Sequence, residues 1–235
     1  MLGWRFPRRG RGFWFSLAID LIWPPLAAFT RLRLRGGENI PRTGGVILAA
    51  NHLSGADPIV LTAYALSARR IPRYLARANL WDVPVVGRVL RGGGHIPVHR
   101  GTADAVHAYR DAVAALDRGE CVTIYPEATY TDQPDHWPSA KVKNGVARIA
   151  LAAGVPVVPV AIWGTHRLLP HNARFPRLLP RHDVTVLAGS PVPLDDLIAE
   201  NGPVDRETAD AATKRIMAAV TGLLAGIRGE RPPVD

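Results

Sequence analysis

The chain has 235 residues, of which 47% are hydrophobic and 21% are charged. A composition of this kind supports a packed core and excludes global disorder, and the length predicts one domain, or one domain with an appendage. Cys121 is the single cysteine. A disulfide framework and a thiolate zinc cluster are therefore excluded, and a reducing compartment is the simplest interpretation.

The basic excess of the chain is concentrated at its N-terminus. The formal net charge is +9, and residues 1–35 contain seven arginines against one acidic residue, Asp20. This asymmetry indicates that one end of the protein meets an anionic surface. Nucleic acid is not the expected partner, because the arginines flank an apolar block rather than a polar face with stacking aromatics.

The apolar block at residues 13–29 is near the lower length limit for a membrane span. Asp20 and the Pro24–Pro25 pair interrupt it, and a proline pair is expected to kink or end a helix. We therefore predict that residues 1–35 form a helical segment, an apolar hairpin lying on an anionic membrane surface at the cytoplasmic face. The alternatives are a signal peptide without a convincing cleavage site and an ordinary amphipathic helix packed on the domain.

Residues 36–235 alternate short apolar runs with helical patterns. This alternation predicts an α/β domain with a central, mostly parallel sheet flanked by helices. Strands are expected at 44–51, 72–77, 94–99, 120–126, 155–163 and 182–189. Helices are expected at 57–68, in two short pieces within 79–91, and at 102–118, 142–154 and 203–228. Sheets of this type place their chemistry in loops at the carboxyl ends of strands.

The motif N-H-x4-D directly follows the first buried strand, with Asn51, His52 and Asp57 at its fixed positions. Asp57 and Pro58 are expected to begin a helix, with Asp57 as its N-cap. Gly55 is expected to let the loop fold back sharply. The carboxylate would then orient the imidazole of His52 and leave its other nitrogen as a general base. A turn histidine beside a capping aspartate is the alternative interpretation.

Other histidines do not form a convincing metal site. His95 and His99 are four residues apart, but three glycines and Pro97 argue against a helix there, so no metal is expected. His166, His171 and His182 are interpreted as solvated loop residues, and Cys121 as a core residue. The chain contains neither G-x-S-x-G nor a phosphate-binding P-loop.

Three later blocks join the N-H-x4-D motif in order. GGHIPVHR ends at Arg100, YPEATY spans 125–130, and VPVVPVAI spans 155–162. Together the four blocks resemble the glycerolipid acyltransferase family, which includes the lysophosphatidic acid acyltransferases. The resemblance covers roughly residues 35–190, and four ordered blocks are far more specific than any one. Arg77 and Lys143 stand where the family often has a lysine.

The third block departs from the family pattern at two positions. Ala128 replaces the usual glycine, which is expected to stiffen the turn, and Tyr130 replaces an arginine that normally faces the phosphate of the acceptor. The replacement of arginine by Tyr130 concerns the identity of the acceptor more than the mechanism of acyl transfer.

The resemblance implies acyl transfer from acyl-CoA or acyl carrier protein to the free hydroxyl of 1-acyl-glycerol 3-phosphate, with no cofactor beyond this co-substrate. His52 would act as general base and Asp57 would orient it. Phosphate binding would fall to Arg77, Arg100 and Lys143. Asn51, Glu127, Thr129 and Tyr130 would bind substrate or support the site. Glu127 would hold an arginine or bind an acceptor hydroxyl.

Two other functions remain open from the sequence. One is acyl transfer to another lysolipid or to a glycosylated phospholipid, which the neutral Tyr130 favours. The other is a non-catalytic lipid-binding protein at the membrane surface, against which the intact His52 and Asp57 argue.

Overall fold

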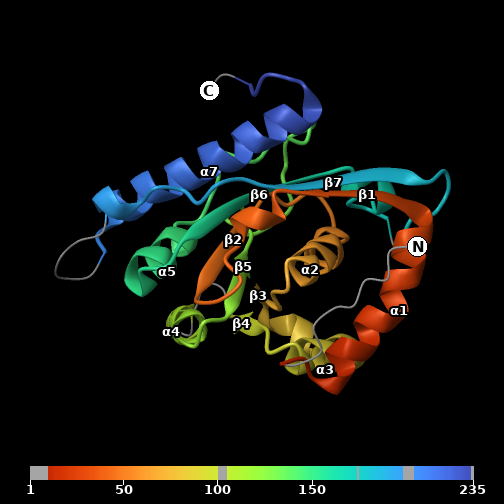
Figure 1. Ribbon diagram of the computed structural model, residues 1–235, viewed down its shortest axis with the longest axis horizontal. Coiled ribbons are helices and arrows are strands. Elements are labelled where there is room, and N and C mark those ends of the chain that lie inside the picture. The colour runs from red at the N-terminus through yellow and green to blue at the C-terminus, as the bar shows by residue number, and fades with distance from the viewer. Residues whose placement is uncertain (1–9, 100–104, 174, 198–203, 234–235) are drawn as a thin grey trace.

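A computed structural model describes residues 10–99, 105–173, 175–197 and 204–233. Its centre is a seven-stranded sheet with the order β1-β7-β6-β2-β5-β3-β4 (Figure 1). The strands are β1 (Thr30–Arg35), β2 (Val46–Ala50), β3 (Pro72–Arg77), β4 (Ile96–Val98), β5 (Cys121–Ile124), β6 (Val157–Trp163) and β7 (His182–Ala188). All neighbouring strands are parallel except β6 and β7. The structure confirms the expected α/β class with a mostly parallel sheet.

Helices cover both faces of the sheet (Figure 1). They are α1 (Phe13–Phe29), α2 (Asp57–Ser67), α3 (Pro84–Gly92), α4 (Ala105–Asp117), α5 (Gly145–Ala153), α6 (Thr165–Leu168) and α7 (Arg206–Arg228). Short 3₁₀ turns lie at Gly37–Asn39, Ala78–Asp82 and Asp195–Leu197. Helix α2 packs on one face, and α4, α5 and α7 pack on the other.

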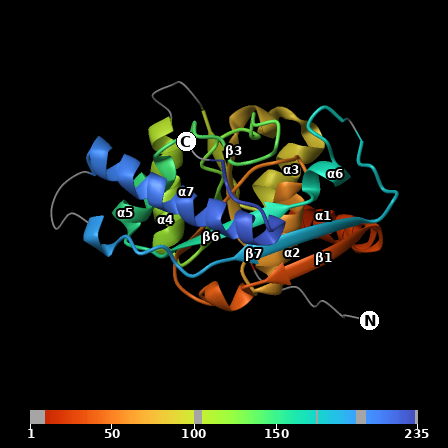
Figure 2. The same ribbon diagram turned by 90° about the horizontal axis from the view of Figure 1, so that it is seen from above.

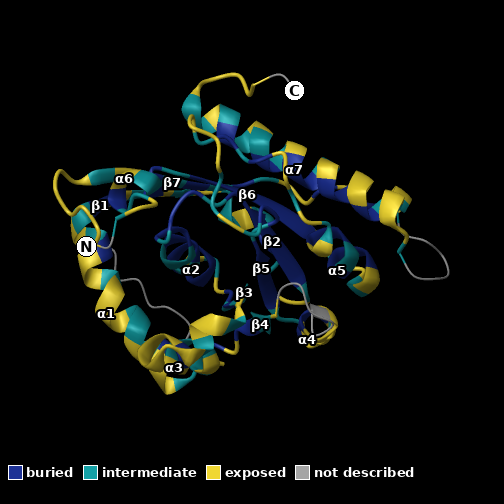
Figure 3. Cartoon of the chain, turned by 180° about the vertical axis from the view of Figure 1, so that it is seen from behind, coloured by how far each residue is buried: buried dark blue, intermediate teal, exposed yellow. Residues whose placement is uncertain are grey.

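The central strands are buried on both faces, which explains their continuous apolar sequences. All five residues of β2 are buried. Because successive side chains of a strand point to opposite faces, Leu48 packs with α2 whereas Ile47 and Ala49 pack with α4, α5 and α7. Figure 3 shows the buried strands between helices whose outer faces are exposed. This packing fixes the carboxyl end of β2, where the N-H-x4-D motif begins.

Over residues 10–35 the N-terminal segment differs from the helical hairpin expected for residues 1–35, whose first nine residues lie outside the described part of the chain. Helix α1 is one helix that continues through Pro24 and Pro25 and ends at Phe29. Residues 30–35, TRLRLR, form the edge strand β1, which pairs in parallel with β7. Their alternation of polar and apolar residues has the period of a strand. The last six residues of the predicted segment therefore belong to the sheet.

Helix α1 lies beside α3 at one end of the molecule (Figures 1 and 2). Phe15 and Leu26 are its buried residues, whereas Phe13 and Leu21 are 72% and 67% exposed. Among the described helices, none combines the length and the apolar character that a membrane crossing requires.

Candidate active site

The loop that follows β2 begins with a residue that joins two strands. The side-chain Nδ2 of Asn51 donates to the carbonyl of Ile162 at 3.0 Å, and the amide of Ile162 donates back to its Oδ1 at 2.7 Å. Asn51 is fully buried. The structure therefore places it as a support that fixes the carboxyl ends of β2 and β6 before the chain reaches His52.

His52 and Asp57 form a close pair. The Nδ1 atom of His52 lies 2.8 Å from Oδ2 of Asp57, and this same oxygen accepts hydrogen bonds from the amides of Leu53 and Ser54 at 2.6 and 2.8 Å. An ionised carboxylate only accepts hydrogen bonds, so Nδ1 is the donor, and in the neutral imidazole Nε2 then has a free lone pair. The pair thus presents a nitrogen that can take a proton from a substrate.

Asp57 does not act as the expected N-cap. It is the first residue of α2, and its carboxylate turns back to the loop that precedes the helix. Gly55 lies in a tight turn, as expected, which the amide of Asp57 closes by donating to the carbonyl of Ser54 at 3.0 Å, although the φ of Gly55 is not positive. A Cβ there would lie 3.2 Å from the Leu169 side chain and 3.4 Å from the Tyr130 hydroxyl. The glycine permits close approach of its neighbours.

Two tyrosines flank the imidazole of His52. The ring of Tyr125 stacks on it at a centroid distance of 4.0 Å and an angle of 15°, and the ring of Tyr130 lies at 4.4 Å and 57°. Burial raises the pKa of the Tyr125 hydroxyl well above its usual value. Both rings therefore act as neutral walls that limit how the imidazole can turn.

The buried Glu127 accepts hydrogen bonds from backbone amides, and these partners include no arginine of the described residues, whereas binding of an acceptor hydroxyl stays a prediction. Its Oε1 accepts from the amide of His52 at 2.8 Å, and its Oε2 accepts from the amide of Ser139 at 2.8 Å. The amide of Thr131 donates to the carbonyl of His52 at 2.9 Å. Burial raises the pKa of Glu127 from 4.5 to about 7, although both amide donors act to lower it. The segment after β5 thus holds the backbone of His52 on both sides.

The turn after β5 contains a strained residue. Ala128 has a φ of 58°, in the left-handed region that favours glycine. This is the position where the related family usually has glycine. The expectation that alanine alters this turn therefore has a physical basis in its backbone conformation.

A largely apolar cavity of about 600 Å³ adjoins His52. Its walls come from α1, α2, α3 and β3, and from the segment after β5. Apolar side chains of the three helices include Phe15, Ile19, Trp23, Ile59, Leu66 and Leu90. A cavity of this volume and character fits a hydrocarbon chain and lies in the usual size range for ligand sites.

The predicted phosphate-binding cations have different positions. Arg77 is exposed and lines the apolar cavity together with Thr129 and Tyr130. Lys143 is exposed and lines none of the described cavities, although its amide donates to the carbonyl of Pro126 at 2.8 Å. Arg100 lies outside the described residues. The structure thus brings Arg77, but not Lys143, to the cavity that adjoins His52.

Two histidines interpreted as solvated have specific environments. The ring of His171 contacts that of Tyr130 at 4.7 Å, and His171 lines the apolar cavity. His166 is partly buried, and burial followed by the nearby His136 and Arg167 lowers its pKa to about 4. No local sequence signal marks either residue, because their neighbours come from distant segments. Across the described ranges, no cluster of three potential metal ligands occurs.

The site combines a histidine held by a buried carboxylate with an apolar cavity, at the carboxyl end of a parallel strand. This arrangement places a proton acceptor beside a space that fits a long apolar group. A family model described as Acyltransferase matches residues 31–163, and the chain belongs to this family.

Individual relatives agree with the family assignment. The chain is 29% identical over 146 residues to a 1-acyl-sn-glycerol-3-phosphate acyltransferase of Borreliella burgdorferi, covering 62% of this chain and 56% of the relative. It is 26% identical over 182 residues to a chloroplastic 1-acyl-sn-glycerol-3-phosphate acyltransferase of Brassica napus, covering 76% and 50%. The chain thus spans about half the length of these curated relatives.

The fold also resembles a solved structure. The crystal structure of the 1-acyl-sn-glycerophosphate (LPA) acyltransferase PlsC from Thermotoga maritima superposes with a TM-score of 0.66 and 24% identity. The match covers 93% of this chain and 83% of that chain. At this identity the likeness supports the fold.

Proposed function

We propose that the protein transfers an acyl chain from a thioester donor to the free hydroxyl of 1-acyl-glycerol 3-phosphate, which gives phosphatidic acid. The observation that carries this proposal is the His52–Asp57 pair beside the apolar cavity. Membership of the acyltransferase family and the names of the relatives support the reaction class and the acceptor.

The reaction follows from the free nitrogen of His52. Nε2 takes the proton of the acceptor hydroxyl while that oxygen attacks the carbonyl carbon of the thioester. The new C–O bond forms, the C–S bond breaks, and the departing thiolate recovers the proton from Nε2. Asp57 stabilises the imidazolium that exists between these steps. General-base assistance of this kind contributes about 10²- to 10⁴-fold in rate.

The substrates divide between the apolar cavity and its polar rim. The hydrocarbon part would lie between α1, α2 and α3, because their side chains line the cavity. The phosphate of the acceptor would lie at Arg77, since a guanidinium group matches phosphate oxygens in geometry and charge. Thr129 and Tyr130 line the same region and would contact the glycerol part.

We also propose that α1 and the neighbouring α3 lie on an anionic membrane surface. The support is the exposure of Phe13, Leu21 and Val85 on these two helices and the basic charge around α1. Serine substitutions at Phe13 and Leu21 test this, because they remove exposed apolar contacts without touching the cavity. We expect less protein to float with anionic liposomes; unchanged flotation would contradict the membrane role.

A second acceptor class remains a candidate because of Tyr130. This neutral residue stands where the family usually has arginine, and it lines the cavity beside His52. A glycosylated or otherwise bulkier lysolipid would tolerate a flat neutral neighbour. If such a lipid is the acceptor, Tyr130→Arg should shift preference toward 1-acyl-glycerol 3-phosphate. If 1-acyl-glycerol 3-phosphate is the acceptor, the same change should leave activity on it equal or higher.

An acceptor panel tests the proposed function. Purified protein is incubated with acyl-CoA and a set of lysolipids that includes 1-acyl-glycerol 3-phosphate, and products are identified by mass spectrometry. We expect phosphatidic acid as the main product. If a different lysolipid is acylated fastest, that lysolipid is the acceptor in place of 1-acyl-glycerol 3-phosphate. The absence of any acylated product would overturn the proposal.

A further inference from the structure

A second, larger cavity adjoins the first along a shared wall. Its volume is about 1150 Å³, and Thr129, Tyr130 and His171 line both cavities. The remaining lining comes mainly from the segment after β5 and from α6 and the loop between α6 and β7. That loop lies on the same side of the molecule as α1, away from α4 and α5 (Figures 1 and 2). We call this second cavity the basic cleft.

The basic cleft is rich in cationic and aromatic groups. Three arginines line it, namely Arg167, Arg177 and Arg181, whereas Asp132 is its only acidic residue within the described ranges. The guanidinium of Arg181 donates to the carbonyls of Thr30 and Ala27. No carboxylate of a described residue pairs with these three arginines. The described lining therefore keeps an excess of positive charge, with three arginines against Asp132.

Aromatic rings accompany this charge. The rings of His136 and His166 lie 4.4 Å apart at 30°, and both residues line the cleft with Tyr130. The Nδ1 atom of His166 is buried without a hydrogen-bond partner in the described part of the chain. Flat rings beside arginines provide stacking surfaces for a base and charge for phosphate groups.

We propose that the basic cleft binds the phosphorylated nucleotide part of a coenzyme A thioester. This inference rests on the proposed function and extends it to the carrier of the acyl donor. An acyl-CoA molecule is a hydrocarbon chain and a polyanionic nucleotide arm joined through the reacting carbonyl. The first cavity is largely apolar and matches the hydrocarbon chain, and the basic cleft matches the nucleotide arm. Their shared wall contains Tyr130, whose ring lies 4.4 Å from that of His52.

The size and charge of the cleft favour the donor over the acceptor. A volume of about 1150 Å³ is large for a glycerol phosphate group and fits a nucleotide with its linker. Arg77 already supplies a cation for the acceptor phosphate beside His52. A lipid head group is the competing ligand, because the exposed Leu179 also lines the cleft.

Binding of free nucleotides tests the inference without requiring catalysis. Adenosine 3′,5′-bisphosphate and CoA are titrated by calorimetry into the wild-type protein and into the double variant Arg167→Ala/Arg177→Ala. We expect both ligands to bind the wild type and the double variant to bind them about tenfold more weakly, since charge-assisted contacts at exposed sites are modest. Absence of binding to the wild type, or equal binding to both proteins, overturns the proposal.

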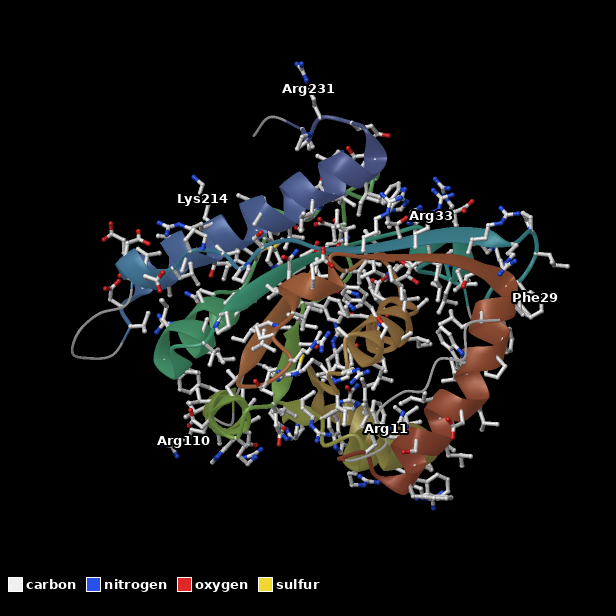
Figure 4. The ribbon with its side chains drawn as sticks, viewed as in Figure 1. Arg11, Phe29, Arg33, Arg110, Lys214 and Arg231 are labelled. Atoms are coloured by element: carbon white, nitrogen blue, oxygen red, sulfur yellow. The ribbon has the colours of Figure 1, made fainter. Side chains whose placement is uncertain are left out.

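Matched variants distinguish a loss of CoA binding caused by the missing charge from one caused by altered folding. Arg110→Ala is the control, because Arg110 lies on α4 and points into solvent away from the cleft (Figure 4); its affinity for CoA should equal that of the wild type. Arg167→Lys/Arg177→Lys keeps the charge and should retain most of the affinity. If the lysine variant binds as poorly as the alanine variant while both melt at the wild-type temperature, simple phosphate attraction is contradicted.

A kinetic comparison distinguishes the donor from the acceptor. In the double alanine variant the KM for acyl-CoA should rise about tenfold while the KM for the lysolipid is unchanged. A rise in the lysolipid KM alone assigns the cleft to the lipid head group and overturns the proposal. His52→Ala should bind CoA as the wild type does. Its CoA binding therefore reports on the cleft even if the proposed acyl transfer fails.

Discussion

Two segments leave neighbouring strands at the same end of the sheet, and they contribute in different ways. The loop after β2 carries His52, and Asp57 begins α2 directly after this loop, only five positions on, so the side-chain pair is local. The segment after β5 supplies no partner to the imidazole nitrogens among the described contacts. It holds the backbone of His52 through Glu127 and Thr131. Proton transfer therefore depends on the loop after β2, and the position of the base depends on the segment after β5.

Substitutions in these two segments should therefore have different effects on activity and stability. A change in the loop after β2 should remove the chemistry and leave substrate binding largely intact, because the loop holds the base. A change in the segment after β5 should alter the stability and position of the base, since Glu127 joins His52 to Ser139 through backbone amides.

Asp57→Asn should have the largest effect among changes that keep His52. The asparagine amide would present a donor where Oδ2 now accepts three hydrogen bonds, so the imidazole would lose its orientation and its counter-charge. We expect kcat to fall by about 10²- to 10⁴-fold, with a smaller change in KM, in a steady-state acyl-transfer assay. A variant that keeps near wild-type kcat would show that the carboxylate is not needed.

Glu127→Gln should change how stability depends on pH. The pKa of Glu127 is raised by burial from 4.5 to about 7, so the folded state holds this proton to higher pH than the unfolded state. Its contribution is fully present below pH 4.5 and is lost as pH rises through about 7. The loss is on the order of 3 kcal/mol.

Urea unfolding of the wild type and of Glu127→Gln between pH 4.5 and 8 measures this contribution. The other titrating groups are shared, so the difference between the two proteins isolates Glu127. We expect the wild type to lose free energy of unfolding relative to the variant as pH rises. Parallel curves for the two proteins would mean that the carboxyl group titrates in the same way in the folded and unfolded states.

Ala128→Gly should have the smallest effect, and it should be stabilising. Ala128 has a positive φ, which costs an L-residue about 1–2 kcal/mol and glycine little. After the greater chain entropy of glycine is included, the free energy of unfolding should rise by about 0.5–1 kcal/mol. Ala152→Gly, at an exposed position of α5, is the control and should destabilise by a similar amount. If the melting temperatures of both variants change in the same direction, backbone strain at Ala128 is contradicted.

Much of the fold could be predicted from the sequence because its signals are local. The strand expected at 72–77 coincides with β3, and the apolar run at 44–51 contains β2. The strand β1 was missed because TRLRLR follows directly on an apolar helix and its arginines resemble the basic cluster that precedes this helix. Its partner β7 lies about 150 residues away in the chain, so only the assembled sheet reveals the pairing.

The site could be predicted only where its contacts are local or its residues carry a motif. His52 and Asp57 belong to one short motif at the end of β2 and the start of α2, and they were identified together. The partners of Glu127 were missed because they are backbone amides, which leave no trace in residue identity. His171 belongs to a loop far from His52 in sequence, and only the structure places it against Tyr130.

In the proposed reaction, His52 takes the proton of an acceptor hydroxyl during acyl transfer. The most direct measurement compares phosphatidic acid formation from acyl-CoA and 1-acyl-glycerol 3-phosphate by the wild type and by His52→Ala, with folding checked by thermal melting. We expect rapid product formation by the wild type and a loss of about 10²- to 10⁴-fold in kcat for the variant, at an unchanged melting temperature. A folded His52→Ala protein that forms phosphatidic acid at the wild-type rate would show that His52 is not the general base.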